Sequence, residues 1–464
     1  MLADALVRPR RVRSLAGLWL HGLILTGVAG LVLALCGNPL VAGLVALGLV
    51  MALSLISNAK NAMLGEPLLF SDLALLVAVY RHPQFYLSAL QPWQLRALAV
   101  GAAGLVALFA WLFVPALLPH LIGLGLAVGA VGLIALSLQL PPWRRLAPEP
   151  AAIMDVARHG LLASLLLYWR RWKATDDPHL CTDGLPQPPT TQLVVVVQCE
   201  SFADPAELFG DSALALPGLA AARAAAWRQG HLLVSGFGAY TNRTEYGVIF
   251  GRDEETLGFR RFDPFLTAMG EASHALPARL ARHGWRNLFV HPHDLGFYSR
   301  DTIMPAAGFA EMVGPEAFAM PAKGEHRYVS DEAIADVIMD RARAAREPGL
   351  FHAVTIENHG PWPADKTCAL KKQSSAYLEL VARGDAMLSR LMADVAALKR
   401  PALLAFYGDH RPSIPGACMP GGDRHTPYVL LRYDAEGQLV RGCGTRRDLT
   451  PAQFHHALID AISA

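Results

Sequence analysis

Residues that can bind a metal ion or act as a nucleophile follow five apolar runs in the second half of the chain. They are Cys199-Glu200-Ser201 after 193–198, Thr241 and Thr244 after 232–237, His291 after 287–290, Glu357 to His359 after 351–356, and Asp409-His410 after 402–407. Ligands of open α/β sheets bind beyond the carboxyl ends of the strands. If the five runs are strands of one sheet, these side chains meet at one edge.

Asp409 and His410 form the most informative of these groups. Adjacent residues at a strand end can both turn toward one ion, and a carboxylate with an imidazole suits Zn²⁺ or Mn²⁺. A single Glu such as Glu200 carries less information, because a Glu in this place is often a helix cap or a surface residue. The coincidence at five strand ends favours a shared site for a divalent cation.

The elements expected to position these residues lie in 191–464. Apolar runs alternate there with amphipathic helical stretches such as 216–228. Runs that are apolar on both faces indicate buried strands of a parallel sheet, and the alternation predicts an α/β sandwich.

The first part of the chain has a different character. Residues 1–140 hold ten charged side chains, whereas the whole chain of 464 residues holds 41 basic and 39 acidic ones. Apolar runs at 14–36, 39–57, 97–117 and 119–140 are each long enough to cross about 30 Å of hydrocarbon. We therefore expect an all-α transmembrane domain at 1–140.

The orientation of this domain raises a parity problem. Arg8, Arg10, Arg11 and Arg13 favour a cytoplasmic N-terminus. Four spans would then return the soluble half to the cytoplasm, so its export needs a fifth crossing, either at 62–80 or at 152–169. The Pro-rich segment 141–190 is expected to be a linker with an interfacial helix.

Composition excludes several classes of protein. An apolar content of 53% argues against a disordered chain, and six cysteines in 464 residues against a disulfide-rich miniprotein. The uncharged N-terminal runs argue against a cytosolic single-domain enzyme. A net charge of +2 without a basic stripe gives no indication of a nucleic-acid partner.

The ordered motifs ES, TNRTEYG, HPHDLGFYSRD, ENHGPW and YGDHRP, spread over about 190–430, resemble those of a known family. They are similar to the lipoteichoic-acid-synthase-like and periplasmic-glucan phosphoglycerol transferases, which are membrane-anchored members of the alkaline phosphatase and sulfatase superfamily. The resemblance implies a C-terminal α/β sandwich of the alkaline phosphatase/sulfatase type, preceded by the transmembrane domain.

The resemblance also implies a metal centre. Glu200, Asp409 and His410 would hold one divalent cation, with Mn²⁺ as the first candidate and Mg²⁺ or Zn²⁺ as alternatives. The nucleophile of the family stands four residues before a Glu-aromatic pair, which here selects Thr241, with Thr244 as the alternative. Coordination would lower the pKa of the threonine hydroxyl.

Further residues match substrate-binding positions of the family. His359 would protonate a leaving group or orient the phosphate, and His291 and Arg300 would bind headgroup and phosphate. Tyr298 stands where the family often has tryptophan. His425 is expected to be a structural or substrate contact, with metal ligation as the alternative.

The expected reaction moves phosphoglycerol from phosphatidylglycerol to an envelope glycan or glycerol-phosphate polymer through a phospho-threonine intermediate. The alternatives are a phosphoethanolamine transferase and a catalytically inert binding protein. Sulfate-ester hydrolysis is disfavoured, because 235–250 lacks the C/S-x-P-x-R segment of true sulfatases. The resemblance places the protein in the inner membrane, with the catalytic domain facing the periplasm or exterior.

Overall fold

A computed structural model describes residues 4–73, 92–321, 327–362, 369–414, 417–442 and 446–464. The chain forms two compact units, Met1–Thr175 and Asp176–Ala464. The segment 141–190, expected to be a linker, is therefore divided between the units.

The first unit is helical. Its long helices are α1 (Leu15–Cys36), α2 (Pro39–Leu64), α5 (Pro92–Trp111) and α6 (Leu117–Ser137), followed by the shorter α7 (Ala152–His159) and α8 (Leu161–Lys173). Within the described ranges, α1, α2 and α6 are long and apolar enough to cross a membrane. The run expected at 97–117 falls on α5, whose apolar part, Ala99–Trp111, is shorter.

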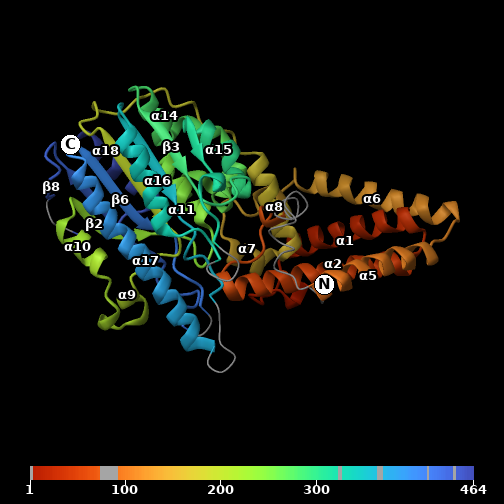
Figure 1. Ribbon diagram of the computed structural model, residues 1–464. Coiled ribbons are helices and arrows are strands. Elements are labelled where there is room, and N and C mark those ends of the chain that lie inside the picture. Colours follow the sequence, from red (N-terminus) through yellow and green to blue (C-terminus); the bar gives the residue numbers. More distant parts are fainter. Residues whose placement is uncertain (1–3, 74–91, 322–326, 363–368, 415–416, 443–445) are drawn as a thin grey trace. The chain divides into compact units, whose positions relative to one another are not determined.

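Helix α1 packs against α2 and α6 (Figure 1). The approach of α1 to α6 depends on glycine, because a Cβ at Gly30 would lie 2.7 Å from the backbone nitrogen of Ala127. Small residues of this kind let apolar helices pack backbone to backbone.

The two candidates for a fifth crossing have different outcomes. The stretch 152–169 does not form a single helix, since Gly160 adopts a φ of 85° and separates α7 from α8. The stretch 62–80 lies partly outside the described residues, and its described part leaves α2 after Leu64.

The second unit contains one sheet of eight strands. They are β1 (Leu193–Cys199), β2 (Arg228–Leu233), β3 (Arg286–Val290), β4 (Glu311–Val313), β5 (Gly349–Val354), β6 (Ala402–Gly408), β7 (His425–Tyr433) and β8 (Leu439–Val440). Their order is β2-β7-β6-β1-β5-β3-β4, with β8 beside β7. The predicted α/β sandwich is confirmed.

The expectation of a parallel sheet needs a correction. The strands from β6 to β4 are parallel, but β7 runs antiparallel to both β6 and β2. The expected strand 232–237 is also displaced, because β2 ends at Leu233 and the chain then leaves the sheet as a loop. Antiparallel β7 brings its first residue, His425, to the edge where the parallel strands end.

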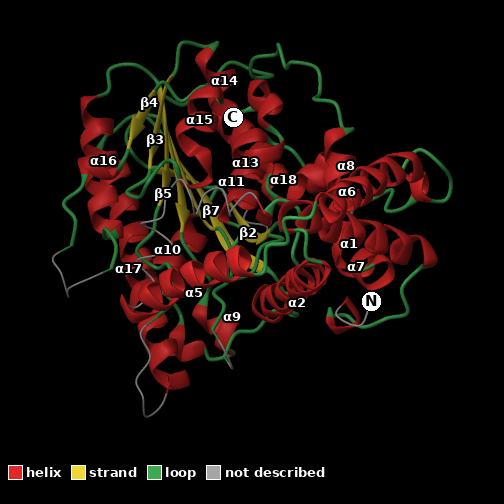
Figure 2. Ribbon diagram, turned by 90° about the vertical axis from the view of Figure 1, so that its right-hand side faces the viewer, coloured by secondary structure: helices red, strands yellow, loops and turns green. Residues whose placement is uncertain are grey.

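Helices cover both faces of the sheet (Figure 2). Alternate residues of β1 belong to different cores. Val195 and Val197 pack with α10 (Pro217–Ala225), α16 (Asp331–Ala344) and α17 (Ala369–Ala397). Val194 and Val196 pack with α11 (Thr241–Phe250), α14 (Leu276–Ala281), α15 (Arg300–Ala306) and α18 (Pro451–Ser463). Burial on both faces fixes the strand register and hence the position of the residues that follow β1.

Candidate active site

Glu200, Asp409 and His410 meet at the ends of the neighbouring strands β1 and β6. One ligand atom from each lies within 4.8 Å of the others. Nε2 of His410 is 3.3 Å from Oδ2 of Asp409 and 3.6 Å from Oε1 of Glu200. The parallel register, which pairs Cys199 with Gly408, brings the residues that follow these two strands together.

This cluster fits a divalent cation. Oδ2 of Asp409 is buried and accepts no hydrogen bond from a described residue, whereas Oδ1 accepts from the backbone nitrogens of Ser201 and His410. Nδ1 of His410 lies 3.2 Å from the carbonyl of Arg411. That contact makes Nδ1 the protonated nitrogen and leaves the Nε2 lone pair facing the carboxylates.

Electrostatics support the same interpretation. Burial, and next the carboxylate of Asp409, raise the pKa of Glu200 to about 8. Two buried carboxylates at this spacing repel each other unless a proton or a cation lies between them. A cation held by Glu200, Asp409 and His410 would remove this repulsion.

Thr241 lies at the same place. It is the first residue of α11, and its Oγ1 is 3.4 Å from Nε2 of His410. The preceding residue, Tyr240, adopts a φ of 77°, a conformation that is costly for a residue with a side chain. The guanidinium of Arg243 lies 3.8 Å from the Tyr240 ring centre and packs against it. A strained turn thus presents the Thr241 hydroxyl at a helix N-terminus, where backbone N–H groups favour anions.

Thr244, the alternative nucleophile, has a different environment. It is 1% exposed, and its hydroxyl donates a hydrogen bond of 2.8 Å to the backbone carbonyl of Asp409. The hydroxyl therefore holds the strand end that carries the metal ligands.

Arg300 and His291 lie at the same sheet edge but are not open to solvent. Arg300 is 2% exposed, and its Nη2 lies 2.6 Å from Glu245, a buried carboxylate of α11. Nδ1 of His291 lies 2.9 Å from the carbonyl of Val354, and its Nε2 lies 3.5 Å from Nη1 of Arg300. Burial lowers the pKa of His291 well below its usual value, so this imidazole is neutral.

Tyr298 lies next to Arg300 in a positive-φ conformation of 59°, with its ring centre 5.3 Å from the guanidinium carbon. Burial raises the pKa of its hydroxyl. Tyr298 therefore stays uncharged and covers the buried ion pair of Arg300 and Glu245.

His359 follows β5 at the same edge of the sheet. Its Nδ1 lies 2.7 Å from the carbonyl of Gly360, and the Tyr328 ring packs edge-on against it at 5.6 Å. The carbonyl makes Nδ1 a donor, so Nε2 is the nitrogen that can exchange a proton with a ligand.

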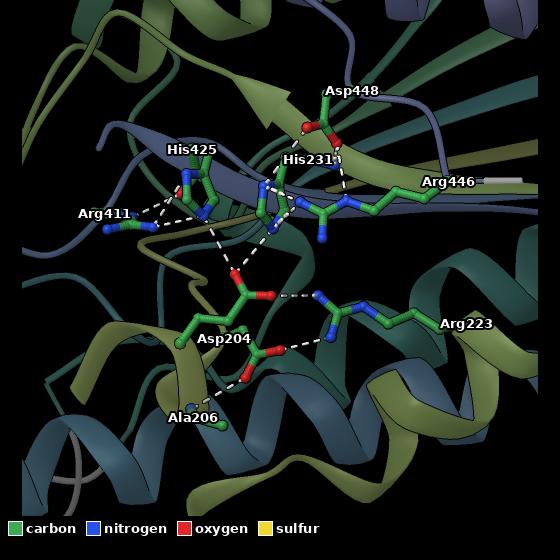
Figure 3. A network of polar contacts seen from close by, with 9 residues as sticks. Asp204, Ala206, Arg223, His231, Arg411, His425, Arg446 and Asp448 are labelled. Carbon is green, nitrogen blue, oxygen red and sulfur yellow. Dashed lines mark hydrogen bonds and ion pairs between the residues drawn. The ribbon is translucent and has the colours of Figure 1, made fainter. Parts of the chain in front are cut away.

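His425 is the predicted residue that the structure places in a separate group. Its ring stacks on His231 at 3.6 Å, and Oε2 of Glu207 lies 2.9 Å from Nε2 of His231 and 3.2 Å from Nε2 of His425. The two rings lie between the guanidinium groups of Arg411 and Arg446 (Figure 3).

Glu207, His231 and His425 could also be read as a second metal site. Two observations oppose this reading. The rings are nearly parallel, at 15°, so their lone pairs do not converge on one point. Nη2 of Arg411 and Nη2 of Arg446 already lie 2.7 Å and 2.9 Å from the two Nε2 atoms, where they would repel a cation. We therefore interpret the group as a closed polar network.

Sequence reasoning missed several residues that support the site. Ser201 donates to Oε1 of Glu200, and the Thr355 hydroxyl accepts from the Glu200 backbone nitrogen. The sequence analysis used Glu245 only to locate the nucleophile. In the structure its carboxylate accepts a hydrogen bond from Arg300. The position of Ser201 directly after Glu200 could have indicated its role, whereas the contact of Thr355 depends on the pairing of β1 with β5.

Comparisons with known proteins agree with this geometry. Residues 192–459 match the sulfatase family. The chain is 29% identical over 450 residues to the capsular polysaccharide biosynthesis protein RkpI of Rhizobium meliloti, covering 91% of this chain and 82% of that protein. It is 24% identical over 234 residues to a putative cyclic beta-1,2-glucan modification protein of the same organism, covering 48% of this chain and 36% of that protein.

A solved structure matches nearly the whole chain. It is the integral membrane lipooligosaccharide phosphoethanolamine transferase EptA from Neisseria meningitidis, with a TM-score of 0.54 and 12% identity, covering 92% of this chain and 88% of that one. Its fold, together with helices α1, α2 and α6, indicates a membrane-anchored protein. Because the family match covers residues 192–459, more than half of the chain, and the second unit has the expected α/β fold, the chain belongs to the sulfatase family.

Proposed function

We propose that this protein is a membrane-bound, metal-dependent phosphotransferase that moves a phosphoglycerol group from phosphatidylglycerol to an envelope glycan or glycerol-phosphate polymer. The observation that carries the proposal is the contact of Oγ1 of Thr241 with Nε2 of His410, inside the cluster of Glu200 and Asp409. Family membership does not imply sulfate hydrolysis, because 235–250 lacks the segment that true sulfatases need.

Glu200, Asp409 and His410 would hold the cation, with Thr241 as a further ligand. A bound divalent ion, with Mn²⁺ as the first candidate and Mg²⁺ or Zn²⁺ as alternatives, would lower the pKa of the threonine hydroxyl and offset the charge of a phosphate group. The helix N-terminus at Thr241 adds backbone donors for phosphate oxygens.

The chain's residues would carry two displacements at phosphorus. The Thr241 oxygen, its proton lost to solvent, forms a bond to phosphorus while the bond to the diacylglycerol oxygen breaks. Protonated Nε2 of His359 gives its proton to that leaving oxygen. An acceptor hydroxyl then attacks the phospho-threonine, returns a proton to Nε2 and releases Thr241.

Two further observations support the choice of headgroup and acceptor. The motifs around Tyr298 and Arg300 resemble those of phosphoglycerol transferases, and a phosphoethanolamine headgroup is the second candidate. A relative named for capsular polysaccharide biosynthesis supports a glycan acceptor. Because such acceptors lie outside the inner membrane, we place the catalytic unit at the periplasm or exterior.

The test uses the full-length protein in vesicles that contain phosphatidylglycerol labelled in its headgroup glycerol. With Mn²⁺, we expect diacylglycerol release and labelled protein, and we expect neither in Thr241→Ala or with excess EDTA. Label transfer from phosphatidylethanolamine but not from phosphatidylglycerol would select the alternative headgroup. No lipid cleavage and no metal binding would favour the inert binding protein.

A further inference from the structure

Two cavities of the second unit adjoin at Glu357 and Arg383, and one of them is lined by His359. One, of about 220 Å³, is lined by Arg327, Tyr328, His359 and Trp362. The other, of about 630 Å³, extends along α16 and α17. Glu357 and Arg383 line both cavities, so the two share a wall.

An ion pair and a backbone hydrogen bond fix the side chains of this shared wall. Arg383 pairs with Glu357 at 2.8 Å, and the other carboxylate oxygen of Glu357 accepts from the backbone nitrogen of Asp331 at 2.8 Å. Glu357 is 5% exposed. A ligand crossing from one cavity to the other would therefore pass a fixed carboxylate and a fixed guanidinium.

The walls carry charges of both signs along their length. Arg327, Arg383 and Arg390 donate hydrogen bonds, whereas Glu332, Glu357 and Glu379 accept them. A polyanion would meet the three carboxylates and a polycation the three guanidinium groups. The arginines and glutamates of the wall pair with one another, since Arg383 contacts Glu357 and Glu379 and Arg390 contacts Glu332, so the wall has little net charge. An acyl chain would remove water from the remaining donors and acceptors of these groups and offer none in return. A neutral molecule with many hydroxyl groups, each both donor and acceptor, satisfies both kinds of wall.

Aromatic rings are placed at the inner end. Tyr328 is partly exposed and packs edge-on against His359, and Trp362 packs edge-on against Tyr377 at 5.3 Å. Aromatic rings offer flat apolar surface to the C–H faces of a ligand, while polar groups around them fix its orientation. His359 lines this end and follows β5, the strand paired with β1, which leads directly to the proposed metal ligand Glu200.

We propose that these two cavities form one groove that binds a saccharide chain, with the hydroxyl to be phosphorylated at the His359 end and further sugar units toward Arg390. The inference rests on the proposed function, because it identifies the acceptor of that reaction. In an in-line displacement the acceptor approaches phosphorus from the side opposite Thr241, where the proton-transfer residue His359 is required. The volume exceeds what a small alcohol such as glycerol would fill, which favours a chain.

The test measures saccharide binding to the full-length protein without any lipid donor. The probes are maltohexaose, cellohexaose and laminarihexaose, with glycerol for comparison, and the readout is a dissociation constant from saturation-transfer NMR. We expect at least one hexasaccharide to bind and glycerol to bind much more weakly.

Matched variants locate the binding. Arg390→Ala removes a guanidinium from the larger cavity. Arg343→Ala is its control, because both arginines pair with Asp394 but Arg343 does not line the groove. Glu379→Gln removes a negative charge from the smaller cavity, which His359 lines. Its control is Glu347→Gln, at an exposed position outside the groove. We expect each groove variant to weaken hexasaccharide binding about five- to tenfold, near the strength of one ordinary hydrogen bond.

The outcomes separate the groove from the reaction. Equal affinities in the groove variants and their controls, or no binding of any hexasaccharide, would overturn the groove. Cleavage of phosphatidylglycerol in the absence of saccharide tests the transferase proposal independently. Binding without lipid cleavage would therefore reject the reaction and retain the groove.

Discussion

Thr241 and Thr244 share one turn of α11 but differ in what their hydroxyls contact. Thr241 faces Nε2 of His410, whereas Thr244 donates to the Asp409 carbonyl. We expect Thr241→Ala to abolish phospho-enzyme formation. Thr244→Ala should keep the phospho-enzyme and lose about 1 kcal/mol of unfolding free energy through the unpaired carbonyl.

Label retained on the protein after lipid cleavage, together with thermal melting, measures both effects. Phospho-enzyme in Thr241→Ala but not in Thr244→Ala would transfer the nucleophile to Thr244.

Asp331 gives a pH prediction away from the metal ligands. Burial, and next the carboxylate of Glu357, raise its pKa to about 7. The folded protein therefore holds a proton on Asp331 up to about pH 7, whereas the unfolded chain releases it near pH 4. The folded state binds more protons in this window, so stability falls as the pH rises from about 4 to 7.

Asp331→Asn removes this titration. We expect the melting temperature of the variant, relative to the natural protein, to be higher at pH 8 than at pH 5, by an amount corresponding to at most a few kcal/mol. Asp340→Asn, an exposed position on the same helix, should show no such trend. A difference that is independent of pH would contradict the prediction.

Residue types after apolar runs were enough to predict that Glu200, Asp409 and His410 lie together, because a strand end projects its next residues toward the sheet edge. The choice of Thr241 over Thr244 came from the family resemblance. The sequence did not predict the contacts of Arg300 and His425. Arg300 is enclosed by Glu245, from a helix 55 residues earlier, and His425 stacks on His231 of another strand. Such pairings depend on tertiary contacts between distant segments.

At the scale of elements, the loop between β2 and α11 positions the nucleophile. Gly238 in this loop has a φ of 62°, and a Cβ there would collide with the Cβ of Ser413. Gly210, which ends α9 (Pro205–Phe209), has a φ of 66° and open space around its Cβ position. The two glycines therefore share their backbone conformation and differ in crowding.

This pair predicts different costs for the same substitution. Gly210→Ala should lose about 1 kcal/mol for the left-handed conformation alone. Gly238→Ala should lose roughly 1–3 kcal/mol more and most of the phospho-enzyme, since the collision displaces the loop that carries Thr241. Equal melting temperatures for the two variants would show that the loop adapts.

The predicted strand boundaries are wrong at the edge of the sheet where β7 runs antiparallel to β6 and β2. The apolar run 232–237 predicts a strand. In the structure β2 begins at Arg228, and its pairing with β7 ends at Leu233, opposite His425. Hydrogen bonding to β7 sets this boundary. Periodicity within 232–237 carries no information about a partner almost two hundred residues later.

At the scale of the whole chain, contacts within the first unit define two ends of its helices. Arg13 donates to the carbonyls of Val156 and Ala157 at 2.9 and 2.6 Å, and Ser14 lies 2.8 Å from Nδ1 of His159. The start of α1 is therefore beside α7. At the opposite end, Val114 donates to the carbonyl of Cys36.

These contacts change the parity argument. If residues 13–14 and 156–159 lie together, the chain between them crosses a membrane an even number of times. Helix α8, with 13 residues, is about 20 Å long and too short to cross about 30 Å. We infer that the chain leaves the first unit, at Thr175, on the membrane side of the N-terminus, so that export of the residues that follow does not need a fifth span.

An exported catalytic unit then requires an exported N-terminus, although Arg8, Arg10 and Arg11 favour the cytoplasm. We expect reporters fused to the N-terminus and to Ala464 of the full chain to report the same side, and a reporter fused after Asn38 to report the opposite side. Reporters on opposite sides at the two termini would contradict the contacts of Arg13. If both termini are cytoplasmic, the contacts of Arg13 hold and the proposed transfer to an exported glycan fails, because the Thr241 site and its acceptor would lie on different sides of the membrane.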